Sequence, residues 1–224
     1  MAGTVAIVLA AGRGERLDPG LPKALVQVGG RTIVARGVEV ATGCRGIDGV
    51  VVVAPAGFED AVAELVRPFG VSDVVTGGAT RQASVRAGLD VVPAGVPAVV
   101  CHDAARPFAT AELFVRAMAA LDGWNGVVPT LPLVDTLKRL AGERIEGTEP
   151  RGAFALAQTP QVFEADALRA AHEVALREGV EATDDAALLE RAGFRIRAID
   201  GERLNLKITT WDDVRLAEAI GGSA

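Results

Sequence analysis

The chain has 224 residues and a formal net charge of −6, and half of its residues are hydrophobic. This composition excludes disordered, collagen-like and coiled-coil proteins, and the negative charge argues against general nucleic-acid binding, which needs a basic face. The two cysteines, Cys44 and Cys101, are too few for a disulfide framework or a zinc site, so we expect both to be small buried side chains.

The first residues include no basic leader, and no apolar stretch approaches the length of a membrane span. We therefore expect a cytoplasmic protein that has neither a membrane nor a nucleic acid as a partner. A chain of this length is most often one domain and this one contains no linker, so we expect a single domain over residues 1–224.

Apolar runs of strand length alternate with amphipathic segments of helix length from the N-terminus onward. The first run (TVAIVLA) is β-branched and almost wholly apolar, which is typical of a strand buried on both faces. In chain order, we expect strands at residues 4–10, 49–54, 71–76, 98–101 and 126–129, and helices at residues 32–41, 59–67, 80–89 and 109–121.

The same alternation returns after residue 152 and indicates parallel strands joined by right-handed crossovers. The predicted fold class is therefore α/β, with a doubly wound, mostly parallel sheet. Ligands of such sheets bind outside the carboxyl ends of the strands, so the segments that follow strands are the candidate sites. In this second half we expect helices at residues 164–178, 184–192 and 211–219, and strands at residues 194–199 and 204–208.

Residues 131–152 interrupt the alternation. The segment VDTLKRL alternates in polarity, AGE makes a turn and RIEGTEP returns, which together predict a β-hairpin. A lone hairpin has no hydrophobic face large enough to be stable by itself, and a second copy of the chain is the simplest surface for it to contact. We therefore expect an arm at about residues 131–152 that forms a homodimer.

The most informative segment is the loop after the first strand, VLAAGRGERLDPGLPKAL. Gly12 and Gly14 allow backbone N–H groups to crowd an anion, and Arg13, Arg16 and Lys23 supply positive charge beside them. The loop lacks the Gly-Lys-Ser/Thr end of a Walker motif, and its prolines prevent the helix that a dinucleotide fingerprint requires. It is predicted to wrap a polyphosphate; the alternative is a surface loop in a glycine-rich protein.

This loop, AAGRGERL followed by PK, resembles the signature of nucleotide-sugar-type nucleotidyltransferases. The segments GGATRQASV, HDAARPF, VDTLKR, TPQVF and NLKIT occur in the same order as in one family among them, the 2-C-methyl-D-erythritol 4-phosphate cytidylyltransferases of the non-mevalonate isoprenoid pathway. The resemblance runs from about residue 6 to residue 218. It implies transfer of CMP from CTP to 2-C-methyl-D-erythritol 4-phosphate, with Mg²⁺ as the cofactor and pyrophosphate as the second product.

The resemblance also implies roles for individual residues. Arg16 and Lys23 would stabilise the transition state, and Mg²⁺ would be held mainly by the CTP phosphates, with Asp103 as a possible ligand. The residues expected to contact the nucleotide are Ala10, Ala11, Gly12, Gly14, Gly77, Gly78, Ser84 and Asp103.

A second set is expected on the acceptor side. Arg151 and Lys207 would position the acceptor phosphate for attack, and Thr136 and Arg151 lie on the predicted arm, so each active site would borrow them from the other subunit if the arm crosses. The residues expected to contact the acceptor are Asp103, Arg106, Thr136, Arg151, Thr159 and Lys207.

Several of these residues also have a plain structural interpretation. Thr80 and Thr110 are placed to cap helices, and His102 is more simply a buried structural histidine. Asp184 and Asp185 open a helix, where they would cap it and offset its dipole, with a metal role as the alternative.

Two other functions remain open at this point. A ribitol 5-phosphate cytidylyltransferase would have a similar skeleton and a different acceptor pocket. A catalytically silent nucleotide-binding regulator would bind CTP and release no pyrophosphate, but the full set of candidate cations argues against it.

Overall fold

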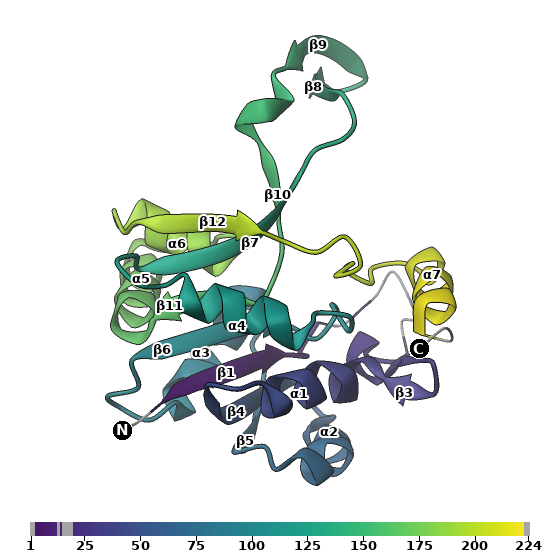
Figure 1. Ribbon diagram of the computed structural model, residues 1–224, viewed down its shortest axis with the longest axis vertical. Helices are drawn as coiled ribbons and strands as arrows, with labels where there is room; N and C mark the ends of the chain where they lie inside the picture. The colour runs from purple at the N-terminus through teal and green to yellow at the C-terminus, as the bar shows by residue number, and fades with distance from the viewer. Residues whose placement is uncertain (1–2, 13, 15–19, 222–224) are drawn as a thin grey trace.

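The computed structural model describes residues 3–12, 14 and 20–221 (Figure 1). Its centre is an eight-stranded sheet. Seven strands follow the order β10-β7-β11-β6-β1-β4-β5, and the eighth, β12, pairs with β7. The strands of this sheet are β1 (Thr4–Leu9), β4 (Ile47–Ala54), β5 (Asp73–Thr76), β6 (Ala98–Asp103), β7 (Gly126–Pro132), β10 (Ala155–Ala157), β11 (Gln161–Glu164) and β12 (Ile196–Asp200).

Most of these strands run in one direction. β1 is parallel to both β4 and β6, β4 is parallel to β5, and β12 is parallel to β7. The predicted α/β class with a mostly parallel sheet is therefore confirmed. The structure adds two antiparallel strands, β10 and β11, that the sequence analysis did not predict; β11 lies between β6 and β7.

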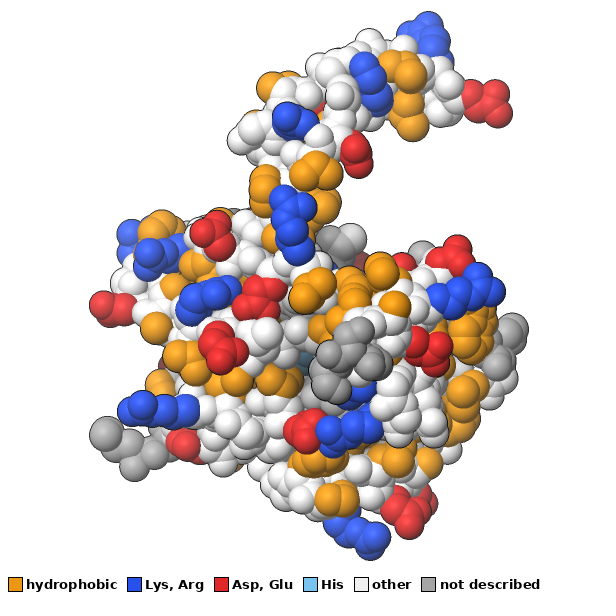
Figure 2. Space-filling model, turned by 45° about the vertical axis from the view of Figure 1, so that its right-hand side comes forward, with side chains coloured by type: hydrophobic (Ala, Val, Ile, Leu, Met, Phe, Trp, Pro, Cys, Tyr) orange, Lys and Arg blue, Asp and Glu red, His pale blue; other side chains and the backbone are white. Residues whose placement is uncertain are grey.

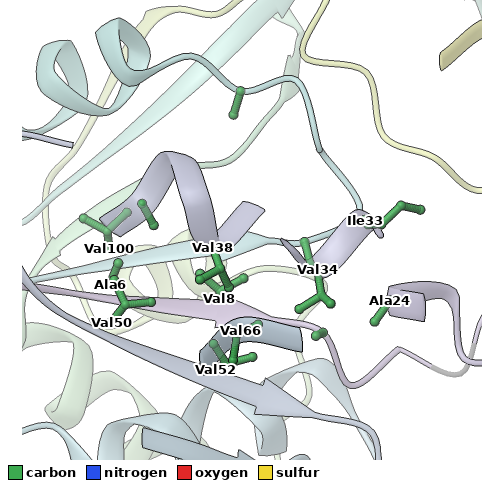
Figure 3. Close-up of a cluster of buried hydrophobic side chains, with 14 of the residues drawn as sticks. Ala6, Val8, Ala24, Ile33, Val34, Val38, Val50, Val52, Val66 and Val100 are labelled. Carbon is green, nitrogen blue, oxygen red and sulfur yellow. The ribbon is translucent and has the colours of Figure 1, made fainter. Parts of the chain in front are cut away.

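Helices cover both faces of the sheet because successive residues of its central strands point to opposite sides. In β1, Ala6 and Val8 contact one buried cluster, and Ile7 and Leu9 contact the other. Figure 3 shows the first of these clusters, where Ala6 and Val8 meet valines of β4 and β6 and of helices α1 (Ile33–Gly43) and α2 (Glu59–Val66).

The remaining helices divide between the same two clusters. Helices α4 (Ala111–Ala119) and α7 (Trp211–Gly221) contribute to the first cluster. Helices α3 (Arg81–Val91), α5 (Ala165–Glu178) and α6 (Asp185–Arg191) contribute to the second. Every predicted helix is present, with ends that differ by a few residues.

The helix caps explain several of these boundaries. The side chains of Thr32, Thr80, Thr110 and Asp184 each accept a hydrogen bond from the backbone N–H three residues later. The predicted capping roles of Thr80, Thr110 and Asp184 are confirmed, and Cys44 and Cys101 are buried free thiols as expected.

The strand predicted at residues 204–208 is wrong. This segment has no regular secondary structure, and the side chains of Arg106 and Gln158 hold it by donating to the carbonyl of Asn205. The alternating polarity of LNLKI misled because it does not follow burial here: the apolar Leu204 is exposed and the polar Asn205 is buried.

The predicted hairpin is present as an arm that stands away from the sheet (Figures 1 and 2). Its strands, β8 (Leu137–Ala141) and β9 (Arg144–Glu149), pair only with each other within the described part of the chain. Hydrophobic side chains lie exposed along the arm and its base, at Val134, Leu140, Ile145, Phe154 and Leu156.

The smaller elements are two short strands, β2 (Gln27–Val28) and β3 (Arg31–Thr32), and the single turns η1 (Lys23–Leu25), η2 (Arg67–Phe69) and η3 (Arg151–Ala153). None of the helices over the described residues is both long enough and apolar enough to span a bilayer.

Candidate active site

A pocket of about 240 Å³ opens at the carboxyl ends of β1 and β6, at the edge of the sheet where ligands were expected. It is bounded by the loop after β1, the segment after β5 that leads into α3, and the segment around Lys207. Eight of the predicted site residues line it: Ala10, Ala11, Gly12, Lys23, Gly78, Ser84, Asp103 and Lys207.

Two glycines beside the pocket allow the loops to approach each other. A Cβ atom on Gly77 would lie 2.1 Å from the Cβ of Ala11. Gly14 has a φ of +68°, and a Cβ on it would lie 2.7 Å from the Cβ of Lys23. Neither glycine lines the pocket, so the structure gives both a role in bringing Ala11 and Lys23 into it.

If the pocket binds the nucleotide that the resemblance implies, replacing Gly77 with alanine is expected to push the loop at Ala11 outward and to raise the KM for that nucleotide by about tenfold, because a contact of this length requires a backbone shift. Gly43→Ala is the matched control, since nothing lies within 4 Å of a Cβ at that position. Steady-state kinetics of both variants would test this, and an unchanged nucleotide KM in Gly77→Ala would contradict it.

Ser84 fixes the turn that carries Gly78. Its hydroxyl oxygen accepts a hydrogen bond from the N–H of Gly78 at 3.2 Å and donates one to the carbonyl of Thr80 at 2.9 Å. Because Ser84 lies in the first turn of α3 and is buried, it holds Gly78 and Thr80 against the pocket.

A line of alternating charges runs from the pocket into the protein interior. Asp103, the last residue of β6, accepts from Lys207 Nζ at 2.7 Å and from Arg81 Nε at 3.1 Å. Arg81 also donates to Asp185 at 2.7 Å, and the other carboxylate oxygen of Asp185 lies 3.0 Å from Nε2 of His172. The pocket therefore contains a carboxylate held between two cations.

These contacts fix the charge states of the two acids. Burial favours the neutral form of Asp103, but Arg81 and Lys207 outweigh it and hold the pKa of that carboxyl well below its usual range. Burial acts in the same direction on Asp185, and Arg81 and His172 again lower its pKa. Both acids are thus ionised at neutral pH.

Lys23 enters the pocket from η1, at the far end of the phosphate loop. Its ammonium group donates to the backbone carbonyl of Ile208 at 2.7 Å, directly after Lys207. The two lysines that the sequence analysis selected therefore come from opposite ends of the chain to the same site. Arg16, the other expected transition-state stabiliser, lies outside the described residues, as does Arg13.

Two residues expected to contact the acceptor are buried beneath the pocket instead of lining it. Arg106 donates to the backbone carbonyls of Asn205, at 2.8 Å, and Ala157, at 3.1 Å. Thr159 accepts from the N–H of Asp103 at 3.0 Å. These contacts make Arg106 and Thr159 parts of the framework that carries the site. Their contact with the acceptor stays a prediction, and Nε of Arg106 has no hydrogen-bond partner among the described residues.

Thr136 and Arg151 lie on the arm, exposed and away from the pocket of their own chain. Arg151 donates to the backbone carbonyl of Val134, which is also on the arm. Within one chain the structure brings Lys207 to the pocket and leaves these two residues outside it.

Arg81 belongs to the segment GGATRQASV, in which no role was predicted for it, and a pair of His172 and Asp185 was not predicted. Asp185 lies in the first turn of α6, as expected for an acid that offsets the helix dipole, and it is in addition a buried partner of Arg81. His102 is buried as expected, with a pKa lowered by burial to about 4, and its Nδ1 lies 3.2 Å from the hydroxyl of Thr159.

A loop with Gly12 and Gly14 and the two lysines Lys23 and Lys207 meet at the carboxyl edge of the sheet, which fits a nucleotidyltransferase, and comparison with known proteins shows this class. Residues 4–222 match the family model of 2-C-methyl-D-erythritol 4-phosphate cytidylyltransferase, and the chain belongs to this family.

Individual relatives cover nearly the whole chain. A 2-C-methyl-D-erythritol 4-phosphate cytidylyltransferase from Frankia casuarinae is 44% identical over 217 residues, which make up 96% of this chain and 80% of the relative. The crystal structure of the enzyme of that name from Thermus thermophilus superimposes with a TM-score of 0.82 at 38% identity and covers 99% of this chain and 100% of its own.

A bifunctional enzyme IspD/IspF from Clavibacter michiganensis is 46% identical over 224 residues, which make up 96% of this chain and 53% of that enzyme. The chain thus spans about half the length of the bifunctional relatives that it matches.

Proposed function

We propose that this chain transfers the cytidylyl group of CTP to 2-C-methyl-D-erythritol 4-phosphate, giving 4-diphosphocytidyl-2-C-methyl-D-erythritol and pyrophosphate in the non-mevalonate isoprenoid pathway. The observation that carries the proposal is the convergence of Lys23, Lys207 and Asp103 on one pocket at the end of the phosphate loop. The family to which the chain belongs supplies the identity of both substrates.

The chemistry of this transfer asks mainly for positive charge and positioning. A phosphate monoester has a second pKa of about 6, so the acceptor is already an anionic nucleophile at neutral pH. One of its oxygens attacks the α-phosphorus of CTP, the bond from that phosphorus to the bridging oxygen breaks, and the electron pair leaves with pyrophosphate. No side chain has to remove a proton, and the barrier comes from bringing two polyanions together.

The pocket offers groups for each part of this reaction. Lys23 would neutralise the charge that develops on the α-phosphate and on the leaving pyrophosphate, together with Arg16. Lys207 would hold the acceptor phosphate, and Asp103 beside it would accept hydrogen bonds from hydroxyl groups of the acceptor or the ribose.

Mg²⁺ is the expected cofactor, and the donor set of the pocket limits how the protein would hold it. Asp103 supplies the carboxylate of the described lining, and both of its oxygens already accept from Arg81 and Lys207. Across residues 3–12, 14 and 20–221, no group of three or more His, Cys, Asp or Glu side chains is placed to hold a metal. This set fits an ion that arrives with CTP and is held mainly by phosphate oxygens, where it would reduce their negative charge.

The arm would complete the site of a second copy of the chain. A hairpin that carries exposed Val134, Leu140 and Ile145 gains stability when a partner covers it. The same contact would bring Thr136 and Arg151 of one subunit to the pocket of the other, as the resemblance implies. The homodimer and the cytoplasmic location expected from the sequence are both part of this proposal.

A mixture of two inactive variants would test the crossing of the arm. In a heterodimer of Arg151→Ala and Lys207→Ala subunits, one site keeps both residues if the arms cross. An equal mixture is therefore expected to recover about a quarter of wild-type activity after subunit exchange, because half of the dimers are mixed and half of their sites are intact. Mixing Lys23→Ala with Lys207→Ala is the control. It should recover nothing, because each pocket takes both lysines from its own subunit and every pocket in the mixture lacks one of them. Recovery in neither mixture would contradict the crossed arm.

The substrates are tested by a pyrophosphate-release assay that combines CTP, UTP and ATP in turn with 2-C-methyl-D-erythritol 4-phosphate and ribitol 5-phosphate. We expect turnover only with CTP and methylerythritol phosphate. Turnover of ribitol phosphate alone would favour the alternative cytidylyltransferase. Binding of CTP without pyrophosphate release would favour a regulatory protein.

A further inference from the structure

The segment that carries Lys207 is joined to the rest of the chain by backbone hydrogen bonds at its two ends. Residues 201–208 form neither helix nor strand. At the first end, the N–H of Gly201 donates to the carbonyl of Thr130 at 2.9 Å. The N–H of Ile208 donates to the carbonyl of Ala105 at 2.8 Å, and this bond anchors the end of the segment. Between its ends, two buried side chains bind the segment: Arg106 donates to the carbonyl of Asn205 at 2.8 Å, and Gln158 makes four hydrogen bonds to Glu202 and Asn205.

The carboxamide of Gln158 is saturated by this segment. Its oxygen accepts from the N–H of Glu202 at 3.0 Å and from the side-chain amide of Asn205 at 3.3 Å. Its nitrogen donates to the carbonyls of Glu202, at 2.9 Å, and Asn205, at 3.2 Å. A carboxamide has two protons to donate and two lone pairs, so every one of its sites is used on the residues just before Lys207.

The backbone that carries Gln158 also holds Asp103. The hydroxyl of the next residue, Thr159, accepts from the N–H of Asp103 at 3.0 Å, and the side-chain amide of Asn205 donates to the carbonyl of Thr159 at 2.8 Å. The same two residues, Gln158 and Thr159, therefore hold the backbone on both sides of the ion pair between Lys207 and Asp103.

We propose that Gln158 is a positioning residue of the transfer reaction, which sets the place of the Lys207 ammonium group beside Asp103. This inference rests on the proposed function for its effect on catalysis: Lys207 would hold the acceptor phosphate, so a displaced Lys207 weakens acceptor binding more than CTP binding. Its effect on the position of Lys207 does not depend on that function.

The test uses two variants that disturb the hydrogen bonds between Gln158 and residues 202–205 in different ways. Gln158→Met keeps the length of the side chain and removes all four hydrogen bonds. Gly201→Ala keeps Gln158 itself, but a Cβ at this position would lie 2.5 Å from its carboxamide oxygen and displace it. The matched control is Gln82→Met, because the carboxamide of Gln82 likewise holds a loop, through Val180 and Ala182, and these hydrogen bonds do not involve residues 201–208.

Lysine is rare enough in this chain to give a direct readout. Only Lys23, Lys138 and Lys207 are present, so a protein labelled with ¹³C at the lysine ε-carbon gives three signals, assigned from single Lys→Arg variants. We expect the Lys207 signal of the free protein to move or broaden in Gln158→Met and Gly201→Ala. The Lys138 signal, which comes from the arm, should stay in place as the internal reference.

Steady-state kinetics then separate an effect on acceptor binding from an effect on CTP binding. In both variants the KM for methylerythritol phosphate should rise by about tenfold, as expected for the loss of buried hydrogen bonds, while the KM for CTP stays within about threefold. In a Lys207→Ala background, Gln158→Met should add less than about threefold, because a residue that acts through Lys207 has nothing left to position.

An unmoved Lys207 signal in both variants overturns the proposal, as does an equal loss of affinity for CTP and acceptor. Wild-type protein that transfers no cytidylyl group overturns the proposed function instead, and the lysine signals still decide whether Gln158 sets the position of Lys207.

Discussion

Replacing Lys23 with methionine is expected to lower kcat for cytidylyl transfer by about 100- to 1000-fold, because it removes a fixed positive charge from the place where charge develops on the reacting phosphate. Methionine retains the length of the side chain and much of its packing. The ammonium group of Lys23 lies in the pocket and is oriented by the carbonyl of Ile208, so it is held in position before the substrate binds. A preorganised charge of this kind lowers the barrier without a cost of reorientation.

Steady-state pyrophosphate release checks this prediction, and Lys138→Met is the matched control. Lys138 is an exposed lysine of the arm whose ammonium group donates to the hydroxyl of Thr148, and its replacement should leave kcat within about twofold of wild type, as for most exposed surface positions. If Lys23→Met retained turnover within a few-fold of wild type, the proposed role of Lys23 would be wrong. Lys23→Arg should recover part of the loss, since it restores the charge with a different shape.

The sequence was informative wherever local pattern determines structure. The apolar run of β1 predicts a strand with two buried faces, and the glycines after it predict a loop that turns at the carboxyl edge of the sheet. Lys23 follows from its place at the end of that loop. The ordered motifs then identify the family, so the two lysines of the pocket could be chosen before any contact was known.

Sequence reasoning failed where a contact joins segments that are distant in the chain. The contacts of Arg106 with the carbonyls of Ala157 and Asn205 lie 51 and 99 residues away in the chain, so the sequence could not show this structural role. Arg81 and Asp185 are 104 residues apart and form a buried pair that no periodicity reports. The short strand β11 is almost wholly buried, and a four-residue run carries too little pattern to separate a strand from a loop.

The buried pair has a large expected effect on stability. Replacing Asp185 with asparagine is expected to lower the free energy of unfolding at pH 7 by about 3–5 kcal/mol, because the charge of Arg81 is then balanced only by Asp103, which is shared with Lys207. It should also weaken the nucleotide site, since Arg81 lines the pocket and is oriented by Asp185.

Asp184→Asn is the control next to it. Asp184 caps α6 by accepting from the N–H of Ala187 at 3.0 Å, and asparagine caps helices about as well, so this variant should stay within about 1 kcal/mol of wild type. Denaturant unfolding measures the free energy of unfolding of both variants, and so compares the loss of a buried ion pair with the change of a helix cap at the adjacent position. A loss below about 1 kcal/mol in Asp185→Asn would show that the pair contributes no net stability.

The pH dependence of unfolding independently checks whether ionised Asp185 stabilises the folded protein. The pKa of Asp185 is lowered in the folded protein. Burial alone would raise this pKa, but the effects of Arg81 and His172 lower it by more than burial raises it. The unfolded chain therefore binds a proton at higher pH than the folded chain. The stabilisation from Asp185 is complete above the unfolded value of about 3.9 and is lost as the pH falls below it, through the lower folded value. Wild-type protein should accordingly lose stability steeply below about pH 4, and Asp185→Asn should lose less over the same interval, because it has one fewer carboxylate to protonate. Equal losses in the two proteins would mean that Asp185 is not held ionised by Arg81 and His172.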